Sequence, residues 1–65
     1  MREKMLAALK LYAEGQIELH KMNVEVYLTN PAGIGEHPDV MESVQKELGQ
    51  IAEWEDQIFV LEKHF

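Results

Sequence analysis

The chain has no cysteine, which excludes disulfide bonds and thiolate metal sites. No apolar run approaches the ~20 residues of a membrane span, and none behind the charged start is long enough for a signal peptide. Six basic residues against twelve acidic ones give a net charge of −6, whereas a nucleic-acid duplex attracts the opposite sign. We therefore expect a soluble, acidic, intracellular protein without a membrane partner.

Prolines are also scarce, and both of them lie with two of the four glycines in one central stretch. A helical pattern on each side of that stretch predicts a helix over 3–28, a loop over 29–38 and a helix over 39–63. Pro31 disfavours helix at the residue before it, and Asp39 opens the spacing of a capping box. The sequence therefore predicts an all-α fold, an antiparallel helical hairpin in a single domain.

The size of the chain limits what such a hairpin can bury by itself. A chain of 65 residues buries only about 60% of its unfolded surface, and one small core contributes roughly 3–5 kcal/mol. Since disulfides and thiolate metal sites are excluded, oligomerisation is the remedy that we expect.

The first helix carries two adjacent apolar stripes, about twice the ~100° width that a single neighbour covers. The first stripe contains Leu6, Leu9, Ala13, Ile17, Val24 and Tyr27, and the second contains Met5, Tyr12, Leu19 and Val26. One partner helix cannot cover both stripes. We therefore predict a homodimeric four-helix bundle or a higher oligomer.

The second helix has an apolar residue every seven positions, the spacing of coiled-coil-like packing. This series consists of Val44, Ile51, Ile58 and Phe65. The residues that we expect in the core or the oligomer interface are Leu9, Tyr12, Leu19, Val24, Val44, Leu48, Ile51 and Ile58. Gly15 is expected opposite Ala52, where it would allow the helices to approach closely.

Four polar residues fall inside the apolar arcs, and we interpret them as a structural polar layer. They are Gln16, His20, Asn23 and Glu55, and antiparallel pairing also brings Glu47 near His20. Exposure of Glu55 at a subunit boundary is one alternative. A metal or acid–base site is another, but helical metal sites typically pair Glu and His at spacing three, which His20 lacks. We expect neither a cofactor nor a bound metal.

Partner-binding candidates lie in the loop and on the second helix. They are Ile34, Glu36, His37 and Trp54. Gly33 and Gly35 resemble a phosphate-binding turn, but the neighbouring acids would repel an anion. Trp54 and Phe59 either belong to the core or form an apolar patch that fits a protein partner.

Two functions fit these features. The first is a non-enzymatic interaction module that binds another protein. The alternative is nucleic-acid binding by basic residues that dimer symmetry brings together, namely Arg2, Lys4, Lys10 and Lys21. No nucleophile–base set can be read from the sequence, so an enzyme is not expected.

The stretch 27–39 with its Gly-Ile-Gly-Glu-His segment, and the ending Leu-Glu-Lys-His-Phe, carry a family resemblance. The chain resembles a family of very small proteins from tailed phages of marine cyanobacteria, the cyanomyoviruses. The resemblance spans the whole chain and implies a viral protein made in the host cytoplasm. It brings no activity and no site residue with it.

Overall fold

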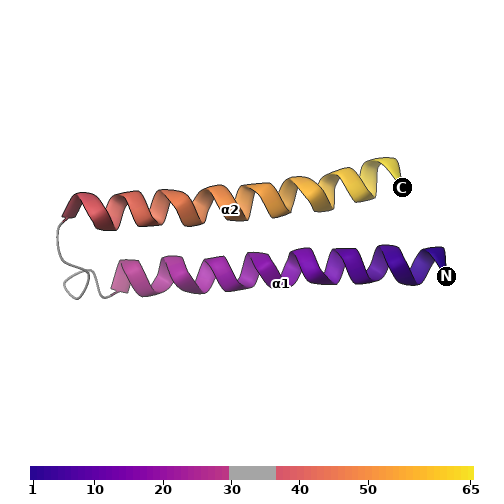
Figure 1. Ribbon diagram of the computed structural model, residues 1–65, viewed down its shortest axis with the longest axis horizontal. Helices are drawn as coiled ribbons and strands as arrows, with labels where there is room; N and C mark the ends of the chain where they lie inside the picture. The colour runs from indigo at the N-terminus through magenta and orange to yellow at the C-terminus, as the bar shows by residue number, and fades with distance from the viewer. Residues whose placement is uncertain (30–36) are drawn as a thin grey trace.

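The protein is a hairpin of two long antiparallel α-helices. The computed structural model describes residues 1–29 and 37–65, with only the backbone of His37 and Pro38. Helix α1 spans Arg2–Thr29 and α2 spans His37–His64, and the two lie side by side along their length (Figure 1). The described ranges contain no strand. The predicted all-α helical hairpin is thus confirmed.

Both helices extend slightly beyond their predicted bounds. Helix α2 begins at His37, so Asp39 lies in its first turn and does not precede the helix as a cap. An acidic side chain there complements the helix dipole, as do Lys63 and His64 in the last turn. Pro38 also lies in the first turn, where its missing N–H costs no helical hydrogen bond.

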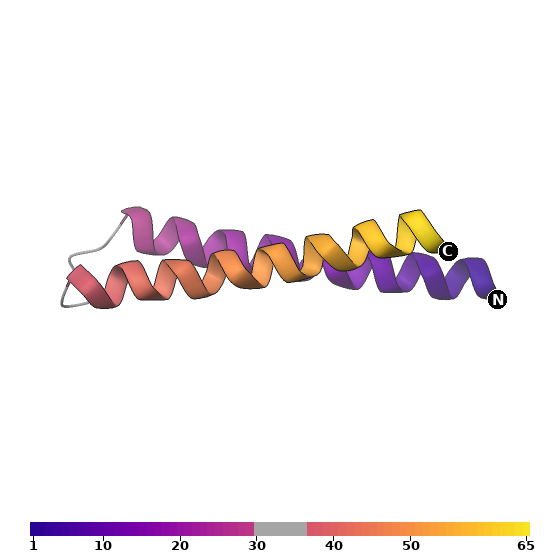
Figure 2. The ribbon, with the colours of Figure 1, turned by 90° about the horizontal axis from the view of Figure 1, so that it is seen from above.

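The two helices meet along one line of side chains on each, which we call the hairpin seam. In α1 it consists of Leu6, Lys10, Ala13, Ile17, His20, Val24 and Tyr27. In α2 it consists of Val40, Val44, Glu47, Ile51, Trp54, Ile58 and Leu61. Each line alternates steps of four and three residues, as in a coiled coil, and the helices cross at a shallow angle in Figure 2.

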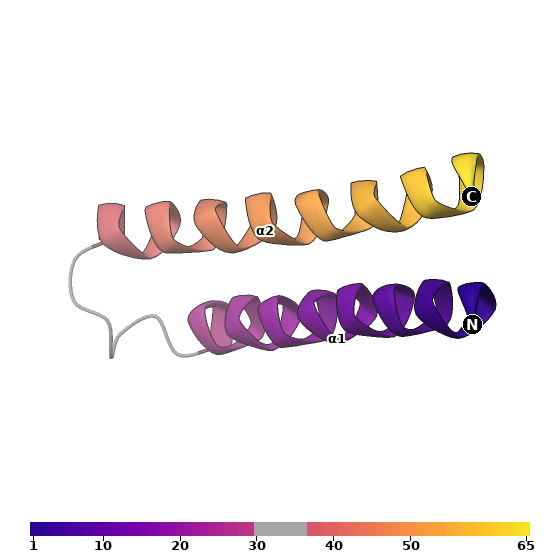
Figure 3. The ribbon, with the colours of Figure 1, turned by 45° about the vertical axis from the view of Figure 1, so that its right-hand side comes forward.

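The seam buries little surface, because each helix has only one neighbour. Among the described side chains, Ala13 and Val40 alone are buried. The molecule is also elongated, with a radius of gyration of 15.0 Å against about 11 Å for a compact chain of this length. Figure 3 likewise shows the hairpin as two single helices, with no third element of the described residues packed against either. Much apolar surface therefore stays open to solvent.

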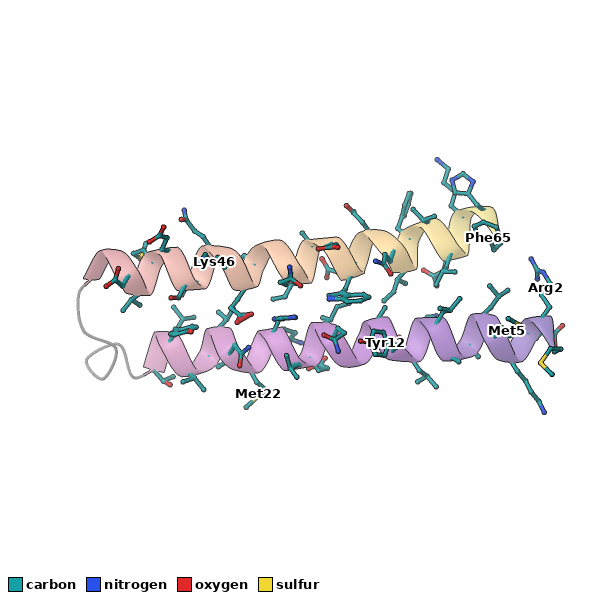
Figure 4. The ribbon with its side chains drawn as sticks, viewed as in Figure 1. Arg2, Met5, Tyr12, Met22, Lys46 and Phe65 are labelled. Carbon is teal, nitrogen blue, oxygen red and sulfur yellow. The ribbon has the colours of Figure 1, made fainter. Side chains whose placement is uncertain are left out.

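The open end of the hairpin is held by a polar contact between the two termini. Arg2 Nη2 donates a hydrogen bond to the backbone carbonyl of Phe65, at 2.8 Å, and the two residues face each other in Figure 4. This contact fixes the antiparallel alignment at the end that lacks a covalent turn.

Candidate interaction surfaces

A polar layer crosses the hairpin seam near the turn, formed by His20, Asn23 and Glu47. His20 Nδ1 donates to Glu47 Oε2, and Asn23 Nδ2 donates to Glu47 Oε1 at 2.9 Å. The side chains of His20 and Glu47 are only 15% and 17% exposed. Glu47 therefore satisfies one donor from each of two successive turns of α1.

The layer matches part of the sequence interpretation. His20 and Glu47 meet as the antiparallel register predicted, and Asn23 joins them. Gln16 is half-buried beside the seam, without a hydrogen bond to the layer. Glu55 is exposed, so its placement in the layer is corrected: it lies beside the seam, one position away from Trp54. The carboxylate of Glu47 alone supplies both hydrogen-bond acceptors of the layer.

The layer has the composition of a structural device and lacks that of a metal site. No group of three or more His, Asp and Glu side chains converges within residues 1–29 and 37–65. Its one carboxylate already accepts hydrogen bonds on both oxygens. A half-buried polar group of this kind fixes the register of two helices, because slippage would leave its donors unpaired.

An aromatic pair occupies the middle of the hairpin. The rings of Tyr12 and Trp54 lie 5.4 Å apart at 75°, an edge-to-face arrangement. Trp54 is half-buried in the seam, and its Nε1 is buried without a hydrogen-bond partner among the described residues. This places Trp54, a predicted partner-binding candidate, in the contact between the helices. Tyr12 remains 61% exposed although its ring contacts Trp54 of α2.

A second apolar line runs along α1 outside the hairpin seam, and we call it the outer α1 face; within it, Tyr12 also contacts Trp54 of α2. It consists of Met5, Ala8, Tyr12, Gly15, Leu19, Met22 and Val26. Its large side chains are between 51% and 63% exposed, and Met22 points directly away from α2 in Figure 4. Steps of three and four residues alternate along it without a break. The face therefore has the residue spacing of a coiled-coil seam, and α2 leaves it largely uncovered.

Gly15 lies at the centre of the outer α1 face and does not contact α2. A Cβ built there meets nothing within 4 Å, and the same holds for Gly49 on α2. The expected close approach of Gly15 to Ala52 is therefore wrong. Gly15 is instead a gap in an exposed apolar line, at the middle of a helix where glycine costs about 1 kcal/mol relative to alanine.

The predicted core residues divide between the two seams of the molecule. Val24, Val44, Ile51 and Ile58 are half-buried between the helices. Four others are more than half exposed in the single hairpin, namely Leu9, Tyr12, Leu19 and Leu48. These four are not core residues of the hairpin, because a two-helix contact covers only one stripe of each helix.

The lateral groove is a hollow along one flank of the hairpin, between the two helices. Its lining consists of Glu18, Lys21, Met22, Val24, Glu25, Leu48 and Ile51, of which Met22 also belongs to the outer α1 face. Leu48 and Ile51 form its apolar floor with Val24, while two carboxylates stand on its α1 wall. Since Lys21 Nζ pairs with Glu18 at 3.3 Å, the only cation among these residues is already matched by a carboxylate.

A different hollow lies on the opposite flank, where Leu9 of α1 meets Gln57 and Val60 of α2. Leu48 and Val60 thus mark the two flanks of α2. The exposed apolar residues of the two helices consequently lie on different sides of the molecule. Those of α1 lie on its outer face and on the flank that contains Leu9, whereas those of α2 are centred on the flank that contains Leu48.

The basic residues of the nucleic-acid alternative are largely engaged within the chain. Lys10 Nζ pairs with Glu62 at 3.2 Å, and Lys21 pairs with Glu18. Arg2 donates to the terminal carbonyl group of Phe65. Lys4 is exposed on α1. These ion pairs lie on the surface and contribute little to stability. They nevertheless place the side-chain cations next to carboxylates of the same chain.

The remaining partner-binding candidates cannot be placed in a surface. Ile34 and Glu36 lie outside the described residues, and the side chain of His37 does as well. Neither α1 nor α2 combines the length and apolar character that crossing a membrane requires.

Comparison with protein-family models, with curated proteins and with solved structures finds no match to the chain. The surfaces described above are therefore interpreted from their own geometry and chemistry.

The sequence interpretation missed Ala8, Gly15 and Met22 as members of the outer α1 face. The signal was present as an alternation of three- and four-residue steps from Met5 to Val26. A helical wheel merges the outer α1 face with the hairpin seam into one broad apolar arc. The alternating steps of three and four residues along the sequence separate the two lines.

Proposed function

We propose that the protein is a non-enzymatic interaction module that self-associates through the outer α1 face. The observation that supports this most strongly is the uncovered second seam, in which five large side chains are more than half exposed. Burying each such side chain contributes about 1.5–3 kcal/mol. Covering this seam would supply stabilisation that a two-helix contact alone does not provide.

The outer α1 face is complementary to itself when two copies run antiparallel. With the two-fold axis beside Gly15, between Gly15 and Gln16, Met5 of one copy lies opposite Val26 of the other, and Tyr12 lies opposite Leu19. Ala8 then faces Met22, so that a small side chain meets a large one. The absence of a Cβ at Gly15 lets the helix axes approach where they cross.

Charges beside the face favour the same antiparallel orientation. Lys4 lies near the start of α1, whereas Glu18 and Glu25 lie in its second half, on the same edge of the face. Antiparallel pairing brings Lys4 of one copy near Glu25 of the other. Parallel pairing would place Lys4 against Lys4 and Glu25 against Glu25, which is unfavourable.

The resulting assembly would have four helices, with two α1 helices at its centre and one α2 on each outer side. The acidic α2 surfaces would then be displayed for a protein partner. The resemblance to cyanophage proteins supports a host or viral protein as that partner, in the cytoplasm of an infected cell. Pairing through α1 would cover Met22 at the rim of the lateral groove and would leave Leu48 and Ile51 of α2 free.

Analytical ultracentrifugation tests self-association directly. We expect a mass of two chains at micromolar concentration, and we expect Leu19→Glu to shift the population to monomer because it places a charge in the apolar face. Val60→Glu is the matched control, since Val60 is exposed on α2 and lies away from the outer α1 face. A folded wild-type monomer, or equal effects of both variants, would contradict the proposal.

A further inference from the structure

The lateral groove is a second surface, and its chemistry is different from that of the outer α1 face. Its floor contains Leu48, which is 51% exposed, beside Val24 and Ile51 of the seam. On α2 the apolar surface continues through two more exposed residues, Met41 and Phe59, each 61% exposed. An apolar strip therefore follows this flank of α2.

Carboxylates stand beside this strip on α1 and within it on α2. Glu18 and Glu25 border it from α1, and Glu55 lies one heptad after Leu48 on the same line of α2. Glu18 is bound to Lys21, whereas Glu55 has no ion-pair partner among the described residues. Glu25 has none within the described part of its own chain, and it is the residue that the proposed dimer brings near Lys4 of the second copy. Lys63 Nζ lies 5.6 Å from the Phe59 ring centroid at the far end of the strip. Around Leu48 the flank thus combines an apolar floor with carboxylates, those of Glu25 and Glu55, that pair with no cation in residues 1–29 and 37–65.

We propose that the lateral groove binds an amphipathic helix with a basic polar face, supplied by a partner protein. An amphipathic helix places its apolar side chains into such a groove through residues spaced by three and four. Lysine or arginine at the edges of that helix would face Glu25 and Glu55, and this complementarity favours a cationic helix over an acidic one.

A second copy of this chain fits the groove less well than a basic helix does. The exposed strip of α2 has acidic neighbours, so pairing two such strips would bring Glu55 and Glu25 near carboxylates of the other copy. The outer α1 face has no such excess, because Lys4 lies on the same edge as its acids. The two surfaces are therefore expected to bind different partners.

A labelled amphipathic peptide of leucine and lysine provides the probe, with a leucine–glutamate peptide of identical pattern as its counterpart. Fluorescence anisotropy should show binding of the basic peptide alone, weakened by added salt. Leu48→Gln should weaken binding about tenfold or more. Val60→Gln, which removes a similar exposed side chain from the opposite flank, should leave binding unchanged. Circular dichroism of both variants verifies that the helices are intact.

Three binding results would overturn the proposal. They are equal binding of the two peptides, equal binding by Leu48→Gln and the wild type, and an equal loss in Val60→Gln. A lower sedimentation mass of Leu48→Gln would also overturn it, since a second copy would then occupy the groove. Leu19→Glu should retain peptide binding, which separates failure of this inference from failure of self-association.

Discussion

Glu47 is the residue on which the polar layer depends, because it accepts hydrogen bonds from both His20 and Asn23. Replacing it with alanine leaves two half-buried donors without their acceptor. We expect Glu47→Ala to lower the free energy of unfolding by about 1–3 kcal/mol. Thermal or urea unfolding at a fixed protein concentration measures this loss.

Glu55→Ala is the control for that prediction. Both residues are glutamates in the middle of α2, so the gain in helix propensity is the same. Glu55, however, is exposed and makes no hydrogen bond to His20, Asn23 or Glu47. Its replacement should change stability by no more than about 0.5 kcal/mol. Equal stabilities of the two variants would show that the polar layer contributes nothing.

The sequence predicted a contact in the polar layer correctly only where the antiparallel register was sufficient to place both residues. This register alone predicts that His20 lies near Glu47. Glu55 was misplaced because exposed apolar residues on one flank of α2, such as Leu48 and Phe59, shift the centre of the apolar arc away from the true seam. A helical wheel cannot tell an uncovered apolar residue from a covered one.

Gly15 and Gly49 make a matched pair at the scale of the helix. Each interrupts a long helix, and a Cβ at either position meets nothing within 4 Å in the hairpin. Alanine should favour the helix by up to about 1 kcal/mol at each position. Gly49→Ala should therefore raise the melting temperature, by about 4–8 °C per kcal/mol for a domain of this size.

The two substitutions should differ in their effect on self-association. Gly15 lies where the α1 helices are proposed to cross, so a methyl group there holds the helix axes apart. We expect Gly15→Ala to raise the dissociation constant of the dimer, while Gly49→Ala leaves it unchanged. Sedimentation equilibrium of both variants makes the comparison. If Gly15→Ala associates as tightly as Gly49→Ala, the crossing does not occur at Gly15.

Helix existence was predictable from sequence to within a few residues, since the apolar periodicity and the central prolines agree. The start of α2 was placed two residues late because Asp39 was interpreted as a cap, whereas it lies in the first turn. The excess width of the apolar arc on α1 was also visible in the sequence. The sequence did not show how this arc divides into a hairpin seam and an outer face. That division depends on where α2 packs against α1.

At the scale of the whole molecule, the net charge of −6 and the engaged cations argue against a nucleic-acid surface. Lys10, Lys21 and Arg2 each contact an acceptor of the same chain. We expect no shift of either RNA or DNA in a gel assay at low salt. A shift that weakens with added salt would instead support a basic face.

The orientation of the proposed dimer is open to cysteine cross-linking, because the chain has no cysteine of its own. Met5→Cys and Val26→Cys should each fail to form a disulfide-linked dimer alone. Mixing the two variants should give one, since antiparallel pairing brings these positions together within reach of a disulfide. Cross-linking of each variant alone would indicate a parallel pair.

The central claim is that two α1 helices meet face to face across Gly15, and one cross-linking measurement tests it most directly. Gly15→Cys and Gly49→Cys place a thiol at two helical positions with open space around each. The rate of disulfide-linked dimer formation under mild oxidation is compared between them. We predict rapid dimer formation by Gly15→Cys and little by Gly49→Cys. Equal rates, or faster cross-linking through Gly49→Cys, would contradict the claim.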